Sequence, residues 1–398
     1  MQAFSNKITK EFAYFELQLD DKRYEAAECM ASVMNNNPFS PNIGRPPAFF
    51  AGRSMLLQEF ERALEGPPND PVLFSVVVGS SGIGKTAFLG EVAKLAIQKN
   101  WIPVHVVASD NLLFDVLDSI RFGANHLLDA DQKIRMRSID VDCRLIKMTF
   151  DRMENAGNSW MAQMEAYLAE LSAKQIGLFI CVDEILKSCE SFNLFLEYCQ
   201  LFNSRGYRLA FLGAGLPYEI ERLFSGHSAS FRSRVRRVTL DVLTAEEAAQ
   251  AFVETAACGE RRFSEDAVSA LVDFCGGHPY ALQLAGYYAW READQCVIQE
   301  DAALRGIAAT SKHLAEQIVL PQLEALSYKQ LCYLEVLAQL DTPAYPSDVA
   351  AALGVSEALE RVVRIQLQRA GLLQSGSKKD SPVAFKIPFL RDYLSEEA

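Results

Sequence analysis

The sequence lacks paired cysteines and an excess of positive charge, and each absence excludes a class of protein. Its nine cysteines are an odd number, and no two of them have C-x-x-C spacing. A disulfide framework or a zinc site is therefore not expected, and the pattern is typical of free thiols in a reducing compartment. The formal net charge is −12, which argues against a protein that coats nucleic acid, because attraction to phosphates requires clustered lysines and arginines.

Long apolar segments are also absent. No run of about 18 apolar residues occurs, so no membrane span is expected, and the first residues lack the apolar region of a signal peptide. We find no internal repeat and no low-complexity segment. These absences predict a soluble cytoplasmic protein without membrane contact, and a chain of 398 residues predicts roughly two or three domains.

The first half of the chain alternates short apolar runs with helical segments. The runs are mostly apolar rather than alternating, as in strands that are buried on both faces of a parallel sheet. We therefore predict an α/β domain over 46–243, after an N-terminal helical extension and linker over 1–45. The expected strands are 72–79, 101–108, 177–184 and 207–215, and the expected helices are 53–65 and 85–100.

Strand signals fade after residue 243, which predicts a helical second half. Thr244 and Glu247 form a capping box at the start of a helix, and two further helices are expected to be separated by Gly276 and Gly277. This pattern predicts a helical lid over 244–322.

The remaining segment, 323–398, predicts a winged-helix domain. A second capping box at Ser327 and Gln330 begins a helix, and two more helices are expected at about 346–353 and 356–370. Two short strand-like pieces around a polar turn follow. Three helices and a β-hairpin make up a winged helix.

Residues 76–88, VVVGSSGIGKTAF, carry the strongest motif. The segment matches G-x-x-x-x-G-K-[ST], the P-loop or Walker A motif. Glycines allow the backbone to fold around a phosphate with its N–H groups pointing inward, and the following helix contributes the positive end of its dipole. Lys85 suits the β- and γ-phosphates, and the Thr86 hydroxyl suits Mg²⁺. The residues expected to bind nucleotide are Gly79, Ser80, Ser81, Gly82, Ile83, Gly84, Lys85, Thr86 and Ala87.

The run LFICVDE, at 178–184, is the candidate Walker B strand, because it ends in two carboxylates. Asp183 is expected to hold Mg²⁺ through water, and Glu184 is expected to polarise the attacking water. The adjacent Asp-Glu pair favours hydrolysis over phosphoryl transfer to another substrate. The alternative is a strand that merely ends in acidic residues.

Three further segments resemble bacterial AAA+-type ATPases, which are related to the origin-recognition initiators of archaea and to STAND signalling ATPases. These segments are PPAFFAGRSMLLQEFERAL, LAFLGAGLP and GGHPYALQLAGYYAW, and the resemblance spans about residues 37–398. It implies a P-loop parallel-sheet domain with a helical lid and a C-terminal winged helix.

The resemblance also implies roles for individual residues. Arg53 resembles the arginine of the family's "GR" box, which lies near the adenine. The alternative is an ordinary surface arginine at the start of a helix. His278 and Pro279 resemble the element with which STAND relatives touch the base or ribose. Arg234 best matches an arginine finger that reaches the γ-phosphate, either from the same chain or from a neighbour, and it would act with catalytic Lys85 and Glu184. A solvated basic turn would have the same sequence.

The chain departs from the family at two sensor positions. AAA+ enzymes usually place a polar residue at the end of the strand that here ends in Gly213, Ala214 and Gly215. The second sensor, an arginine, is missing from GGHPYALQ. We therefore expect slow hydrolysis, as in a switch.

The helix expected at 356–370 has an apolar stripe and a polar face. Helical spacing places Arg361, Arg364 and Gln368 on that polar face, and Lys378 and Lys379 follow in the wing. A recognition helix in a DNA major groove has this character, and so does an ordinary solvated face.

The sequence predicts an ATP-binding, Mg²⁺-dependent ATPase that acts as a nucleotide-controlled switch on a protein partner or on its own oligomer. One alternative is an initiator- or transposition-like ATPase that binds DNA through the winged helix. Another is a protein that binds ATP or ADP without turnover. The pattern assigns no role to 1–45 or to 109–175.

Overall fold

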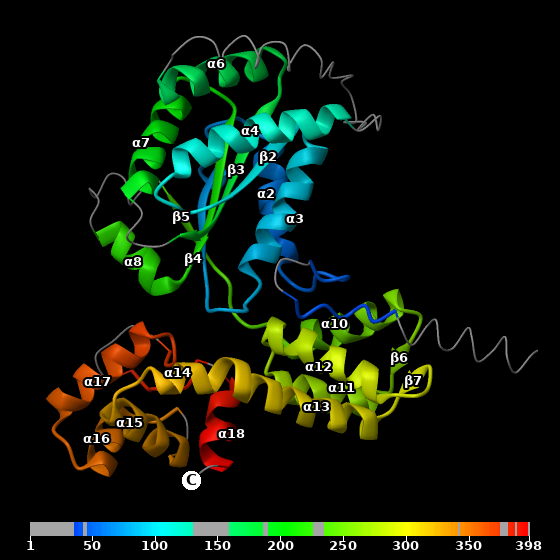
Figure 1. The fold of residues 1–398 in the computed structure, drawn as a ribbon, viewed down its shortest axis with the longest axis vertical. Helices are drawn as coiled ribbons and strands as arrows, with labels where there is room; N and C mark the ends of the chain where they lie inside the picture. The colour runs from blue at the N-terminus through cyan, green and yellow to red at the C-terminus, as the bar shows by residue number, and fades with distance from the viewer. Residues whose placement is uncertain are drawn as a thin grey trace, which may run out of the picture. The chain divides into compact units, whose positions relative to one another are not determined.

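The computed structural model describes residues 36–42, 46–129, 159–185, 190–225, 235–340, 343–374, 381–386 and 388–396. The chain divides into two compact units, which are treated separately here (Figure 1). The α/β unit is Gly52–Val242, and the helical unit combines Met1–Ala51 with Leu243–Ala398. None of the described helices is long and apolar enough to cross a bilayer.

The α/β unit is built on a five-stranded sheet with the order β2-β3-β4-β1-β5, in which every neighbouring pair is parallel. The strands are β1 (Phe74–Val78), β2 (Trp101–Val107), β3 (Gly177–Ile185), β4 (Leu209–Gly215) and β5 (Arg236–Thr239). All seven residues of β4 are buried, as expected for a strand covered on both faces. The predicted parallel α/β fold and its first four strands are confirmed.

Helices cover both faces of this sheet. Figure 1 shows α2 and α3 on one side, with α6, α7 and α8 on the other. The helices are α2 (Ser54–Glu65), α3 (Lys85–Gln98), α4 (Leu112–Asp129), α6 (Trp160–Ala173), α7 (Glu190–Ser204) and α8 (Pro217–Ser225), and a 3₁₀ turn, η1, spans Pro71–Leu73. The predicted helices at 53–65 and 85–100 are therefore confirmed within one or two residues.

The edge strand β5 is not predicted by the sequence, because its residues are RRVT and only Val238 is buried. Its two arginines have local partners instead. Arg236 pairs with Glu59 of α2 at 2.7 Å, and the Arg237 guanidinium lies 4.6 Å from the centroid of the Phe224 ring.

The helical unit contains a bundle with a two-stranded parallel sheet. Its elements begin with α10 (Ala245–Cys258), β6 (Arg262–Phe263), α11 (Glu265–Cys275), α12 (Pro279–Glu292), β7 (Val297–Ile298) and α13 (Glu300–Leu314). The capping box of Thr244 and Glu247 is present. Gly276 and Gly277 separate α11 from α12 with φ values of 52° and 72°, a region that glycine tolerates best.

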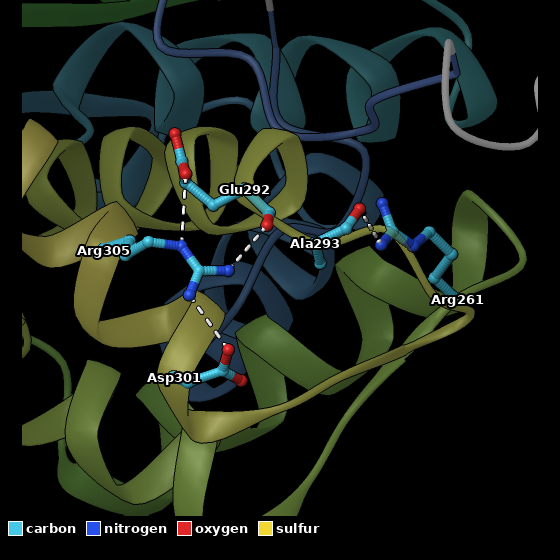
Figure 2. A network of polar contacts seen from close by, with 5 residues as sticks. All are labelled: Arg261, Glu292, Ala293, Asp301 and Arg305. Carbon is cyan, nitrogen blue, oxygen red and sulfur yellow. Dashed lines mark hydrogen bonds and ion pairs between the residues drawn. The ribbon is translucent and has the colours of Figure 1, made fainter.

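Two arginines hold the C-terminal end of α12 and the residue that follows it (Figure 2). Arg261, only 4% exposed, donates to the carbonyls of Trp290 and Ala293 at 2.8 Å each. Arg305 donates to the carbonyl of Glu292 at 3.0 Å and to the Asp301 carboxylate at 2.9 Å. The carbonyls left without partners at the end of α12 are thereby satisfied by cations, which also complement the negative end of the helix dipole.

The helical unit continues without a break in its core. A single apolar cluster extends from Phe39 to Leu394. The predicted boundary between the lid and the winged helix, at 322–323, falls within the helix α14 (Leu320–Glu324). The remaining elements are the π-helical turn η2 (Ala315–Val319), α14 (Leu320–Glu324), α15 (Tyr328–Gln339), α16 (Pro346–Leu353), α17 (Glu357–Arg369) and α18 (Pro388–Glu396). The capping box of Ser327 and Gln330 is present, and isolated antiparallel bridges join Ala344 to Val383 and Leu373 to Phe385.

The predicted polar face of α17 is wrong at Arg364. The side chains of Arg364 and Glu360 are 7% and 1% exposed, and they form an ion pair at 2.9 Å. Glu360 also accepts a hydrogen bond from the Tyr333 hydroxyl of α15 at 2.8 Å. A buried pair satisfies both charges, so helical spacing alone misplaced the arginine. Arg361 is exposed, whereas Lys378 and Lys379 lie outside the described residues.

Candidate functional site

The loop between β1 and α3 has the backbone conformation that the P-loop motif requires. Gly82 and Gly84 have φ values of 71° and 93°, in the left-handed region, and Gly84 is the N-cap of α3. A Cβ on Gly79 would lie 2.6 Å from Cγ2 of Ile83. Glycine is therefore needed at these positions for shape, and the loop ends at a helix N-terminus, where anions bind.

Lys85 and Thr86 begin α3 and are both engaged in polar contacts. The Lys85 ammonium donates to the carbonyls of Gly79 and Ser80 at 3.0 and 2.7 Å. The Thr86 hydroxyl donates to Oδ2 of Asp183 at 2.5 Å. The structure thus brings together the P-loop and the candidate Walker B strand, which are about a hundred residues apart in sequence.

The strand β3 is irregular where its carboxylates lie. Its pairing with β4 shifts register between Val182 and Ile185, and Glu184 between them has a φ of 54°. The other oxygen of Asp183, Oδ1, accepts a hydrogen bond from the Glu184 backbone N–H at 2.8 Å. Asp183 therefore contacts both Thr86 and the backbone of Glu184, and the Glu184 side chain is exposed at the strand end.

The left-handed backbone of Glu184 predicts a measurable strain. A residue with a Cβ in this conformation costs about 1–2 kcal/mol, and glycine removes most of that cost. Glu184→Gly is expected to raise the thermal midpoint of the α/β unit by about 2–4 °C. Glu184→Ala retains the Cβ and serves as the matched control. An equal midpoint shift in both variants would contradict strain at this position.

The oxygen donors at this point suit Mg²⁺. Thr86 supplies a hydroxyl and Asp183 a carboxylate, 2.5 Å apart, and Mg²⁺ is usually bound by one or two such groups together with water and substrate phosphates. Among the described residues, no group of three or more His, Cys, Asp or Glu side chains could hold a metal by itself. The residues present therefore fit a metal that arrives with a polyphosphate.

The structure describes three of the four other predicted site residues. Arg53 also has a left-handed backbone, with φ 62°, and its guanidinium donates to the carbonyl of Asp241. His278, 6% exposed, is the N-cap of α12, and Pro279 is its first residue. Both belong to the helical unit. Arg234 lies outside the described residues. The roles of these residues in nucleotide binding stay predictions.

The unusual glycines at the end of β4 have a packing reason that the sequence does not indicate. A Cβ on Gly213 would lie 2.5 Å from Cδ1 of Ile185, the residue that follows Glu184. A Cβ on Gly215 would lie 2.7 Å from Cδ1 of Ile220. A larger polar residue at these positions would displace the strand end that carries the carboxylates.

Comparison with solved structures places this architecture among known folds. No protein-family model and no curated protein matches the sequence. A Walker-type ATPase of Pyrococcus abyssi superposes with a TM-score of 0.63 at 13% identity, covering 89% of this chain and 99% of that one. The Aeropyrum pernix ORC2 protein, in ADPNP–ADP complexes, gives a TM-score of 0.57 at 16% identity, covering 89% of this chain and 95% of that one. The chain therefore shares the fold of this Walker-type ATPase and of the ORC2 protein.

Proposed function

We propose that this chain binds ATP at residues 79–87 with Mg²⁺, hydrolyses it slowly to ADP and phosphate, and acts as a nucleotide-controlled switch. The observation that carries the proposal is the contact between Thr86 and Asp183 at 2.5 Å. It joins the two motifs that nucleotide hydrolysis requires. The fold shared with Walker-type and ORC proteins supports the same class of activity.

Binding uses groups that are already aligned. The P-loop amides and the N-terminus of α3 supply partial positive charge, and Lys85 must exchange its loop carbonyls for phosphate oxygens. Thr86 and Asp183 would hold Mg²⁺, which supplies neutralisation of the charge that develops on the phosphates. Both residues are held in position by their mutual hydrogen bond.

Glu184 is proposed to orient and deprotonate the attacking water. Its carboxylate is exposed at the end of β3, and its backbone is held through Asp183. Gly213 and Gly215 supply no side chain that could contact the γ-phosphate from the adjacent strand. The site therefore has a base and a phosphate anchor but lacks one of the usual sensors, which supports slow turnover.

The switch is proposed because the nucleotide site and the helical unit are joined by only two chain connections, Ala51–Gly52 and Val242–Leu243. In the α/β unit, Arg53 holds the carbonyl of Asp241. In the helical unit, the Leu243 N–H donates to the Gly277 carbonyl at 2.8 Å. Both sides of the second connection are anchored, so a nucleotide-dependent rotation would be carried mainly by Val242.

The proposed switch acts on a protein partner or on a second copy of the chain. DNA contact through α17 is not included, because Arg364 is buried against Glu360. That contact stays a prediction for Arg361 and the wing. A gel shift with and without ATP tests it directly, since binding through phosphates weakens steeply as salt is raised.

Lys85→Ala tests nucleotide binding. Loss of the ammonium that faces the phosphates is expected to raise the Kd for ATP by about 100-fold, measured by calorimetric titration in the presence of Mg²⁺. The matched control is Lys94→Ala on the same helix. Lys94 is exposed and pairs with Glu91 one turn away, so its removal is expected to leave the Kd unchanged. Equal affinity of Lys85→Ala and the unaltered protein would end the proposal.

A further inference from the structure

A short N-terminal segment packs against the helical unit far from its own place in the sequence. Residues 36–42, NNPFSPN, are called the strap here. Within the strap only Phe39 is buried, with 2% of its surface exposed, and its other residues are exposed or half-buried. The strap therefore contacts the helical unit as a peptide does, through a single anchoring side chain.

The anchor occupies an aromatic pocket formed by three rings. The centroid of the Phe39 ring lies 6.1 Å from that of Phe252, 5.9 Å from that of Phe263 and 6.3 Å from that of Trp290. These rings come from α10, β6 and α12 in turn. Tilted and edge-to-face pairs at such distances are favourable beyond the area that they bury, so the pocket is selective for an aromatic side chain.

Two glycines shape the groove around this pocket. A Cβ on Gly286, inside α12, would lie 2.3 Å from the Phe39 ring. A Cβ on Gly259, after α10, would lie 2.8 Å from Cδ of Pro38 and 2.9 Å from the carbonyl oxygen of Asn36. Glycine within a helix costs stability, and its presence here is explained by the close approach of the strap.

Polar contacts fix the direction of the strap on either side of Phe39. The Asn37 side chain donates to the carbonyl of Tyr287 at 3.0 Å, and its own oxygen accepts from the Phe39 N–H at 3.0 Å. The Ser40 N–H donates to Oε1 of Gln283 at 3.0 Å. Tyr287 and Gln283 lie one turn apart on α12, so this helix holds the strap on both sides of Phe39.

We propose that α10, β6 and α12 form a peptide-binding groove for an Asn-Pro-Phe-Ser segment, occupied here by the strap of the same chain. The same segment of a second copy of this chain is its ligand in trans. Every contact described above lies within the helical unit and involves no P-loop residue, so the groove does not depend on nucleotide. A ligand held by one side chain and two hydrogen bonds to α12 dissociates without global unfolding.

The test uses full-length Phe39→Ala and a labelled peptide of residues 35–42, NNNPFSPN, with binding followed by fluorescence anisotropy in the absence of nucleotide. The variant strap no longer fills the pocket, so the peptide is expected to bind with a Kd on the order of 100 μM. The unaltered protein is expected to bind at least ~10-fold more weakly, because its tethered strap competes at high effective concentration.

Two controls define the site. The peptide NNNPASPN lacks the anchor and is expected to bind at least ~10-fold more weakly to Phe39→Ala. In the double variant Phe39→Ala/Gly286→Ala, the new Cβ enters the pocket, so binding is expected to be lost. A folded Phe39→Ala that fails to bind the peptide overturns the proposal. A Phe39→Ala protein that is unfolded also overturns it, because the helical unit would then need the Phe39 side chain in order to fold.

Discussion

Glu184→Gln is expected to lower the steady-state rate of phosphate release from ATP by about 10²–10⁴-fold. The glutamine has the size of the glutamate and occupies the same exposed end of β3, but its amide cannot accept the proton of the attacking water. The backbone of residue 184 keeps its hydrogen bond to Asp183. The Kd for ATP and the thermal midpoint are therefore expected to stay close to those of the unaltered protein.

A matched control separates this effect from a general loss of negative charge. Glu91→Gln removes a carboxylate of α3 that pairs with Lys94. This substitution is expected to leave the rate of phosphate release unchanged. Equal rates for Glu184→Gln and the unaltered protein would exclude Glu184 as the base. If both rates equal that of the buffer alone, the chain binds nucleotide without turnover, which is the second alternative that the sequence left open.

The sequence predicts the sheet well because its strands are local apolar runs. Residues 177–184 and 207–215 are mostly apolar, and they include nearly all of β3 and the whole of β4. The starts of two helices are also determined by neighbouring residues. In the capping boxes, Thr244 and Ser327 each interact with the residue three positions later in the sequence. Features fixed by neighbours within a few residues are the ones that sequence patterns can indicate.

Features that depend on distant packing were not predicted. The strand β5 is polar and is held by Glu59 and Phe224. The burial of Arg364 depends on Tyr333 and Glu360, which helical spacing alone does not indicate. The strap contacts residues more than 240 positions away. In each case at least one of these partners is distant in sequence, so no local pattern identifies it.

The candidate site likewise has features that the sequence predicts and features that depend on distant packing. The P-loop glycines and the strand-end carboxylates are visible in the sequence because the chemistry of phosphate binding demands them in a fixed order. The left-handed conformation of Glu184 is not visible, since it depends on the register shift between β3 and β4. The glycines that end β4 were interpreted as a missing sensor, and their contacts with Ile185 and Ile220 add a packing reason.

The largest expected effect on stability comes from the buried ion pair of α17. Glu360→Ala leaves the Arg364 guanidinium buried beside an empty space and removes the acceptor of the Tyr333 hydroxyl. Burial, together with the hydrogen bond to Glu360, raises the pKa of Tyr333, so this residue remains a neutral donor. Breaking a buried pair costs about 3–5 kcal/mol. The thermal midpoint of the helical unit, followed by circular dichroism, is expected to fall by roughly 6–20 °C.

Two further variants test whether the stability lost in Glu360→Ala arises from the buried charge of Arg364. Asp301→Ala removes an exposed ion pair with Arg305 and is expected to leave the thermal midpoint nearly unchanged. The double variant Glu360→Met/Arg364→Met replaces both charges with apolar side chains, so it is expected to recover most of the stability lost in Glu360→Ala. If Glu360→Ala melts within about 2 °C of the unaltered protein, Arg364 reaches solvent easily. The polar face that the sequence predicted for α17 would then be restored, and with it the case for a DNA contact.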